Sequence, residues 1–372
     1  GAQILVPAGG SLDIQTDASL LYNLGGVRTL LVNEGMVRKS GGDVSRISAQ
    51  LDNRGTVQVV TGTLELTGGG VSSGDFAVQE NAVLEFRGQS HDFAADSSIG
   101  GEGTIHFSSG TANVGGVLNL TGRLWASGAT VNVNGDAIAA QIVLENGTLG
   151  GSGTVTATEV FTWTGGTLSG AGRLVTSGQW VAEGSTKSLD ARTLVVAGSG
   201  IWRAGNFNTG KGAQILVPAG GSLDIQTDAF LFSNLGGVRT LLVNDGTIKK
   251  SSSGANRIDA VMNNHGTVQV MLGTLEFNGG GVSSGDFTVQ DGAELEMGGQ
   301  THELTADSTI SGVGTVHFSG GTINLAGPVT LSGTLQSSSG TANLDGAVVL
   351  TGTLRVNGGT LNLNSDITAS QA

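Results

Sequence analysis

The stretch GTVHFSGGTINLAGPVTLSGTLQSSSGTANLDGAVVLTGTLRVNGGTLNL (residues 314–363) decides the fold. Motifs of Gly, Thr and an apolar residue begin at a constant spacing, at Gly314, Gly333 and Gly352. A second set with the same spacing begins at Gly321, Gly340 and Gly359. Within a motif apolar residues alternate with polar ones, which is the pattern of a strand with one buried face. Gly, Asn, Asp and Ser, which tolerate turns with positive φ, fill the segments between motifs.

Short strands at a fixed period, with no helical segment between them, are typical of the coils of a parallel β-helix. We therefore predict an all-β fold, a parallel β-helix (β-solenoid) with about 19–20 residues per turn and two or three strands in each turn. Stacking would place equivalent residues about 4.8 Å apart along the axis. Apolar ladders would then fill the interior, and Thr, Asn and charged ladders would coat the outside.

The sequence also contains a second, much longer repeat. Residues 1–18, GAQILVPAGGSLDIQTDA, recur without a change at 212–229. The sequence thus predicts two units of one continuous solenoid, residues 1–211 and a truncated copy, residues 212–372. A duplication this faithful, in a chain that starts and stops in mid-pattern, indicates a segment of a longer tandem array.

Composition argues against several classes of partner. The chain has 65 glycines in 372 residues, 38% apolar and only 13% charged residues, which favours an ordered protein. A formal net charge of −13 without any run of Lys or Arg argues against nucleic acid and anionic membrane surfaces. No apolar run approaches the roughly 18 residues of a membrane span, so no membrane insertion is expected in this segment. The lack of cysteine excludes disulfides, thiolate nucleophiles and Cys-based zinc sites.

Several strings, including VNEGMVRKSGG (residues 32–42), NAVLEFRGQSHDF (residues 81–93) and GEGTIHFSSGTANVGGVLNLTG (residues 101–122), carry a resemblance that covers nearly the whole chain. Together with LDNRGTVQVVTGTLELTGGGVSSGDFAV (residues 51–78) and FTWTGGTLSGAGRL (residues 161–174), they resemble tandem modules of large bacterial exported proteins. These modules are described as filamentous-haemagglutinin-like, autotransporter-passenger-like or giant-adhesin repeats. The resemblance implies a secreted protein of the bacterial cell surface, with neighbouring repeats, other copies of itself or surface glycans as partners.

We therefore expect a non-enzymatic extracellular structural or adhesive β-solenoid, a stalk or fibre segment without cofactors or catalytic residues. The alternative is a polysaccharide-binding or polysaccharide-degrading β-helix of the pectate-lyase-like kind, and a third is an inert spacer. The period is interrupted at residues 37–46 and 88–100 and at their copies, 248–257 and 299–311. We expect these segments to leave the solenoid as loops that carry any binding function.

One acidic pattern is a candidate for acid–base chemistry. Glu65 and Glu85 lie one period apart at the same strand position, as do Glu276 and Glu296. Adjacent turns would hold each pair about 5 Å apart, where two carboxylates raise one another's pKa. No Arg, Lys or His is expected to join both copies of this pair, since Gly298 stands where the first copy has an Arg. That absence favours an exposed glutamate ladder over a catalytic site.

The histidines are expected to lie on the surface without binding metal. His106 and His317 sit between inward-facing apolar residues and should point to solvent. The duplicated pair His91 and His302 is well separated from them in sequence. A zinc site needs three or four converging ligands, so we predict no metal site.

Aromatic residues offer one candidate ligand surface. Trp163, Trp180 and Trp202 could form a platform for sugar rings, since exposed aromatic side chains commonly bind carbohydrates. The alternative is that they fill the interior, because Phe161 and Trp163 share one face of a strand.

Overall fold

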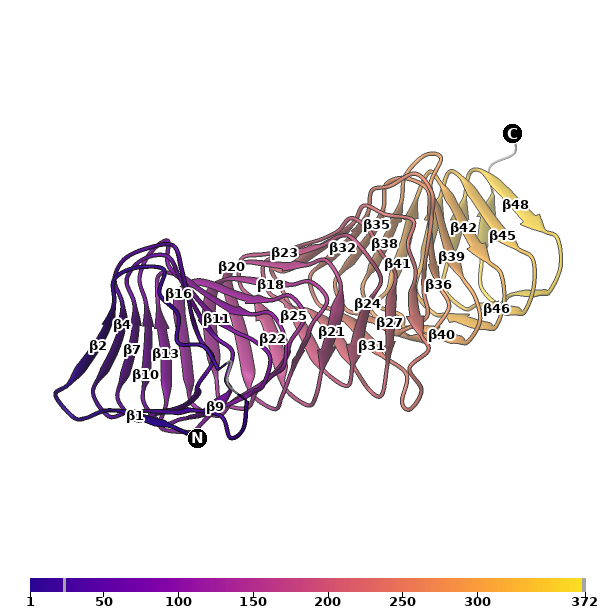
Figure 1. Ribbon diagram of the computed structural model, residues 1–372. Coiled ribbons are helices and arrows are strands. Elements are labelled where there is room, and N and C mark those ends of the chain that lie inside the picture. The colour runs from indigo at the N-terminus through magenta and orange to yellow at the C-terminus, as the bar shows by residue number, and fades with distance from the viewer. Residues whose placement is uncertain (23–24, 370–372) are drawn as a thin grey trace. The chain divides into compact units, whose positions relative to one another are not determined.

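The computed structural model describes residues 1–22 and 25–369, and residues 23, 24 and 370–372 of the two predicted repeats lie outside them. The described residues form 50 strands and no helix, in turns of roughly 20 residues, so the predicted all-β parallel solenoid is confirmed. The chain divides into two compact units, Gly1–Gly178 and Gln179–Ala372. Figure 1 labels many of the strands of both units. This division falls elsewhere than the boundary between the sequence repeats 1–211 and 212–372, which stays a prediction.

Most turns of the first unit contribute strands to three faces, and on every face the strands pair in parallel with those of the next turn. The first face consists of β1 (Gln3–Val6), β3 (Leu30–Asn33), β6 (Gln50–Asn53), β9 (Gly70–Ser72), β12 (Ser90–Phe93), β15 (Thr111–Val114), β17 (Thr130–Val133), β19 (Thr148–Gly150) and β21 (Gly166–Ser169).

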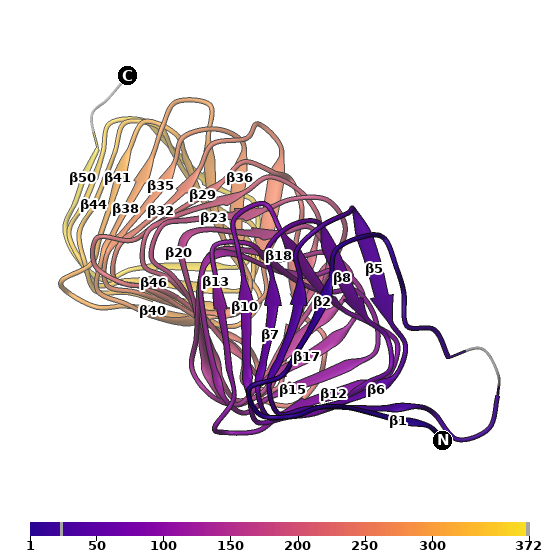
Figure 2. The ribbon, with the colours of Figure 1, turned by 60° about the vertical axis from the view of Figure 1, so that its left-hand side comes forward.

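The second face consists of β2 (Ser11–Ile14), β4 (Met36–Lys39), β7 (Thr56–Val59), β10 (Asp75–Val78), β13 (Ser98–Gly101), the first halves of β16 (Val117–Ala126), β18 (Ala137–Leu144) and β20 (Thr154–Trp163), and β22 (Arg173–Thr176). The third face consists of β5 (Val44–Ile47), β8 (Thr63–Leu66), β11 (Val83–Phe86), β14 (Thr104–Phe107) and the second halves of β16, β18 and β20. In Figure 2 the labels of β12 and β15, of β7 and β10, and of β5 and β8 mark these three walls.

The second unit also has three faces, and they are numbered here by the sequence repeat, in which β28 (Gln214–Val217), β29 (Ser222–Ile225) and β33 (Ala255–Ile258) match β1, β2 and β5. Its first face consists of β25 (Thr193–Val196), β28 (Gln214–Val217), β31 (Leu241–Asn244), β34 (Val261–Asn264), β37 (Gly281–Ser283), β40 (Thr301–Leu304), β43 (Thr322–Leu325), β46 (Thr341–Leu344) and β49 (Thr360–Leu363). Its second face consists of β23 (Gln179–Ala182), β26 (Ser199–Trp202), β29 (Ser222–Ile225), β32 (Thr247–Lys250), β35 (Thr267–Val270), β38 (Asp286–Val289), β41 (Thr309–Gly312), β44 (Val329–Leu331), β47 (Val348–Leu350) and β50 (Ile367–Ala369).

The third face of the second unit consists of β24 (Lys187–Asp190), β27 (Phe207–Gly210), β30 (Leu231–Ser233), β33 (Ala255–Ile258), β36 (Thr274–Phe277), β39 (Glu294–Met297), β42 (Thr315–Phe318), β45 (Thr334–Ser337) and β48 (Thr353–Val356). This face and its counterpart in the first unit carry the charged residues described below.

The interior is a set of apolar ladders. On β8, β11, β14 and the second half of β16, four neighbouring strands of the third face of the first unit, the second position is a buried aliphatic residue, and these residues pair in register from turn to turn: Leu64, Leu84, Ile105 and Leu124. At the fourth position the Phe86 and Phe107 rings stack with their centroids 5.2 Å apart. Burying one such side chain stabilises the fold by about 2 kcal/mol, so the interior supplies most of the favourable free energy.

Asparagines close the corner between the first and second faces. The buried Asn33 side chain donates from Nδ2 to Oδ1 of Asn53 at 2.7 Å and to the Thr56 carbonyl at 3.0 Å. The second copy repeats this with Asn244 and Asn264, again at 2.7 Å. Because the amides satisfy backbone groups that the bend would otherwise leave unpaired, the corner can be buried.

The four segments predicted to leave the solenoid as loops are strands instead, so that prediction is wrong. Residues 88–100 contain β12 and part of β13, and residues 37–46 contain part of β4 and β5. Their copies, residues 248–257 and 299–311, likewise contain strands of the second unit. The apparent interruptions arise because turns differ slightly in length: Leu84 pairs with Leu64 on one side and with Ile105 on the other, and these two steps along the chain are unequal.

The longest turns lie elsewhere. Gln3 pairs with Leu30 and Gln214 with Leu241, which is the same separation in both copies. In the second copy the additional residues include an excursion in which Gly236 and Gly237 both have positive φ. The excursion exposes Val238, whose relative exposure is 74%.

The Gly281 position tests how closely successive turns must approach. This glycine has a φ of +134°, and a Cβ atom there would lie 2.0 Å from the Met262 carbonyl oxygen. Gly292 also has a left-handed φ, +72°, but a Cβ there would meet nothing within 4 Å. We expect Gly281→Ala to lower the free energy of unfolding by about 3 kcal/mol and Gly292→Ala by about 1 kcal/mol, measured by urea denaturation. Equal losses would show that the inter-turn contact carries no steric constraint.

Candidate functional site

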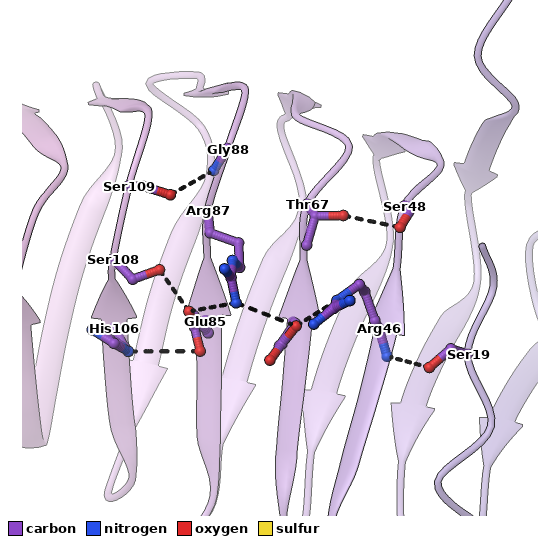
Figure 3. A network of polar contacts seen from close by, with 11 residues as sticks. Ser19, Arg46, Ser48, Thr67, Glu85, Arg87, Gly88, His106, Ser108 and Ser109 are labelled. Carbon is purple, nitrogen blue, oxygen red and sulfur yellow. Dashed lines mark hydrogen bonds and ion pairs between the residues drawn. The ribbon is translucent and has the colours of Figure 1, made fainter. Parts of the chain in front are cut away.

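A ladder of charged side chains lies on the third face of the first unit. Arg46, Glu65, Glu85 and His106 occupy the third position of β5, β8, β11 and β14, and each pairs in register with the next (Figure 3). Because the second and fourth positions of these strands face the interior, the third position faces outward. We call these four residues the first ladder.

The second unit repeats the arrangement. Arg257, Glu276, Glu296 and His317, called here the second ladder, pair in register on β33, β36, β39 and β42. The predicted stacking of each glutamate pair on adjacent turns is therefore confirmed. The expectation that no Arg, Lys or His joins both copies is wrong, because an arginine precedes and a histidine follows the pair in each copy. Sequence reasoning missed them because they lie one whole turn from their partners, and the number of residues in a turn varies.

Both carboxylates of the first ladder have cationic partners. Arg46 donates from Nε to Oε2 of Glu65 at 2.6 Å. Arg87 places Nη1 at 3.7 Å from a carboxylate oxygen of Glu65 and at 3.7 Å from one of Glu85 (Figure 3). An arginine between two stacked carboxylates offsets their mutual repulsion.

Glu85 is held in its ionised form. The polar contact with His106, whose Nδ1 lies 3.7 Å from Glu85 Oε2, is the main cause that lowers the pKa of Glu85. A hydrogen bond from Ser108 Oγ at 2.5 Å lowers this pKa further, and burial opposes both. The charges of His106 and Arg87 also lower it.

In the second ladder, burial and repulsion between the carboxylates outweigh the effect of the cationic partner. Gly298 replaces the arginine that bridges the first pair, and Arg257 donates instead to Asp259 Oδ1 at 2.7 Å. The nearest oxygen of Glu276 lies 3.7 Å from Arg257 Nε. Burial, followed by the neighbouring charge of Glu296, raises the pKa of Glu276 above its ordinary value, and Arg257 only partly opposes this.

An aromatic ring packs against His106, the last residue of the first ladder. The imidazole of His106 stacks on the Trp125 indole with centroids 3.8 Å apart and planes 8° from parallel. Arg123 lies over the same indole at 4.7 Å from the ring centroid to Cζ. His106 Nε2 is 2.8 Å from Ser127 Oγ. His106 and His317 therefore face outward, but their neighbours cover most of each ring.

His91 and His302 are buried, so the prediction that they lie on the surface is wrong. Each is 5% exposed, because it occupies the second, inward-facing position of its strand. The His91 ring packs edge-to-face against Phe86, with centroids 5.1 Å apart. Burial lowers the pKa of His91 to about 4, against opposing backbone hydrogen bonds, and also lowers that of His302.

The three tryptophans proposed as a sugar platform lie in the interior. Trp163 is buried beside Phe161, whose ring centroid is 6.0 Å away, in the first unit. In the second unit the buried Trp180 and Trp202 both contact Phe207, at centroid distances of 6.1 and 4.9 Å. Their rings face the core, so we do not carry the platform into the proposed function.

The charged ladders are well suited to hold one turn against the next. Glu65, Glu85 and Glu276 each have a partner from a neighbouring turn, and partly buried pairs with hydrogen-bonding geometry contribute more than exposed ones. The same side chains also include two carboxylates one turn apart, the minimum set for acid–base chemistry.

Comparisons add no identification: no protein-family model, no curated protein and no solved structure matches this chain. No helix long and apolar enough to span a membrane occurs among the described residues.

Glutamine substitutions should distinguish the two ladders. Glu85→Gln removes a carboxylate that the fold stabilises in its ionised form, so we expect a loss of about 1 kcal/mol in the free energy of unfolding at pH 7, after solvent screening. Glu276→Gln removes a carboxylate whose ionised form is disfavoured by burial, so its free energy of unfolding should stay equal or rise. Urea denaturation of both variants measures the difference.

The pH dependence follows from the sign of each shift. Because the pKa of Glu85 is lowered, its contribution is complete above the ordinary value of 4.5 and is lost as the pH falls below it. The Glu85→Gln penalty should therefore shrink on acidification. For Glu276 the raised pKa means that protonation begins at higher pH in the folded state, which relieves the cost of its charge. Equal effects of the two substitutions at all pH values would contradict this account.

Proposed function

We propose that this chain is a non-enzymatic structural and adhesive β-solenoid, a stalk or fibre segment of a large bacterial surface protein. The observation that carries this proposal is the pairing, residue for residue, of successive turns on each face of both units. Such stacking gives a stiff scaffold whose strands resist local unfolding and proteolysis, which is what a stalk requires.

The charged ladders support a structural role over a catalytic one. Glu65 and Glu85 are engaged by cations of their own and adjacent turns, and Glu276 by Arg257. Side chains committed to such contacts are not free to transfer protons to a substrate without breaking them.

An exposed apolar excursion in each copy supports adhesion. Val27 and Val238 are the equivalent residues, 76% and 74% exposed, in the longest turn of each repeat. The repetition of an exposed valine at the same place gives the surface two identical contact points for a partner. Adhesive surfaces commonly present such loops on a rigid scaffold.

The strand edge at β48, β49 and β50 is suited to pairing with another β-strand. The inward-facing Leu354 and Val356 of β48 are 42% and 55% exposed, whereas their counterparts one turn earlier, Leu335 and Ser337, are 1% exposed. Among the described residues no strand pairs with the outer edge of β48, β49 or β50. Unpaired edges with apolar side chains are templates for another chain.

End-to-end association is therefore a testable consequence. We expect the chain of residues 1–372 to self-associate with rising concentration, and Leu354→Lys combined with Val356→Lys to abolish this by placing charges at the open edge. Val282→Lys is the matched control, because Val282 is exposed on β37 away from that edge. Sedimentation velocity over roughly a hundredfold range of concentration measures it. A wild-type monomer throughout, or equal effects of both variants, would contradict end-to-end association.

A polysaccharide-binding or polysaccharide-degrading protein is the second candidate, favoured by the order Arg–Glu–Glu–His in both ladders. Incubating the chain with a panel of polysaccharides, while scoring retention and oligosaccharide release together, separates the two. We expect no release, because Glu65, Glu85 and Glu276 lie in contact with arginine side chains. Release that is lost on combining Glu65→Gln with Glu276→Gln would overturn the structural proposal and assign the chemistry to the ladders.

A further inference from the structure

The second ladder is more negative than the first, although the backbone is the same. Around the first ladder two arginines, Arg46 and Arg87, face two glutamates; around the second, one arginine faces four carboxylates. The differences all remove positive charge or add negative charge: Ser48, Val83 and Arg87 of the first copy correspond to Asp259, Glu294 and Gly298. An excess of carboxylates on a half-buried face favours binding of a cation, which offsets their repulsion.

Two of these carboxylates converge on a histidine. Glu294 and Glu296 are the first and third residues of β39, so both face outward on the same side of the strand. His317 lies opposite Glu296 on β42. His317 Nδ1 is 2.9 Å from Glu294 Oε1, and one ligand atom from each of the three residues lies within 4.8 Å of the other two.

We propose that Glu294, Glu296 and His317 form a binding site for a divalent transition-metal ion of the zinc class. Two carboxylate oxygens and one imidazole nitrogen are a ligand set that zinc accepts, with water completing the tetrahedron. Bonds of about 2.0–2.2 Å place tetrahedral ligands about 3.4 Å apart, so the three atoms need to approach by at most about 1.4 Å. Rotation of the half-buried glutamate side chains supplies that movement.

The residues behind His317 fit a ligating imidazole. His317 Nε2 is 2.7 Å from Ser338 Oγ and 3.2 Å from Gln336 Nε2. Without metal, Nδ1–H donates to Glu294 while Nε2 accepts from the serine and the amide. With metal on Nδ1, that nitrogen loses its proton and Nε2 gains one from solvent. Nε2–H then donates a hydrogen bond to Ser338 Oγ, and the Gln336 amide, whose nitrogen can only donate, has to turn its oxygen toward the ring. A hydrogen-bond partner on the far nitrogen orients the ring of most metal-ligating histidines.

The first copy provides an internal control. His106 keeps the contact to a serine, with Nε2 at 2.8 Å from Ser127 Oγ. Val83 stands in place of the first glutamate, and Arg87 occupies the space beside Glu85 with a positive charge. The first ladder lacks one ligand and repels a cation, so the chain should bind one equivalent.

Isothermal titration of the full chain with ZnCl2 tests this proposal. The wild type should bind one equivalent, and Glu294→Val, which restores the residue of the first copy, should weaken binding at least about tenfold. His317→Ala should do the same, whereas His106→Ala should leave binding unchanged. His265→Ala is a further control, because His265 is exposed and pairs with Asp245, where zinc could bind adventitiously.

Two further measurements distinguish loss of the metal site from loss of folding. Circular dichroism of each variant establishes that it is folded, and Glu294→Val, an outward substitution, should not disturb the strands. Co2+ in place of Zn2+ should give the intense visible absorption of a four-coordinate site in wild type but not in Glu294→Val. No binding by wild type at millimolar zinc, or full affinity in both folded loss-of-ligand variants, or loss of binding in His106→Ala, would each overturn the proposal.

Discussion

Parallel hydrogen bonding between successive turns is the constraint on which the rest of this structure depends. It places each side chain about 4.8 Å from the side chain at the same position of the next turn, so residues one turn apart in sequence become neighbours in space. For apolar residues such as Leu64 and Leu84 that proximity is favourable, since both leave water together. The proximity of Glu65 and Glu85 is unfavourable, because two carboxylates repel each other. The same register places Arg46 on the turn before this pair and His106 on the turn after it, and contacts with these side chains offset the repulsion.

The two copies show how far side chains can diverge while the backbone register is kept. Arg87 bridges the first glutamate pair, and Gly298 leaves the second pair without that bridge. Polar contacts, above all with His106 and to a smaller extent with Arg87, lower the pKa of Glu85, while burial raises that of Glu276. A duplicated scaffold can thus keep one copy for stability while the other accumulates negative charge.

The interior of the second unit also contains a buried charged side chain. Lys187 is buried, and its Nζ donates to the carbonyls of Ser185 at 2.8 Å and Ala204 at 3.0 Å. Burial lowers the pKa of this lysine to about 8. Its ammonium lies 5.4 Å from the Phe207 ring centroid. Bends in the chain turn carbonyl groups toward the interior, and these groups can satisfy a buried cation.

The sequence by itself determined the period, the parallel solenoid and the stacking of Glu65 on Glu85, because these follow from spacing along the chain. It did not reveal that Arg46 and His106 complete the ladder, since successive turns differ in length and the register is set by pairing. It also left open which way Trp163 faces and placed His91 on the surface, although the structure buries both. Only the tertiary structure decides these, because the inward or outward side of a short strand depends on how its turn closes against the two adjacent turns.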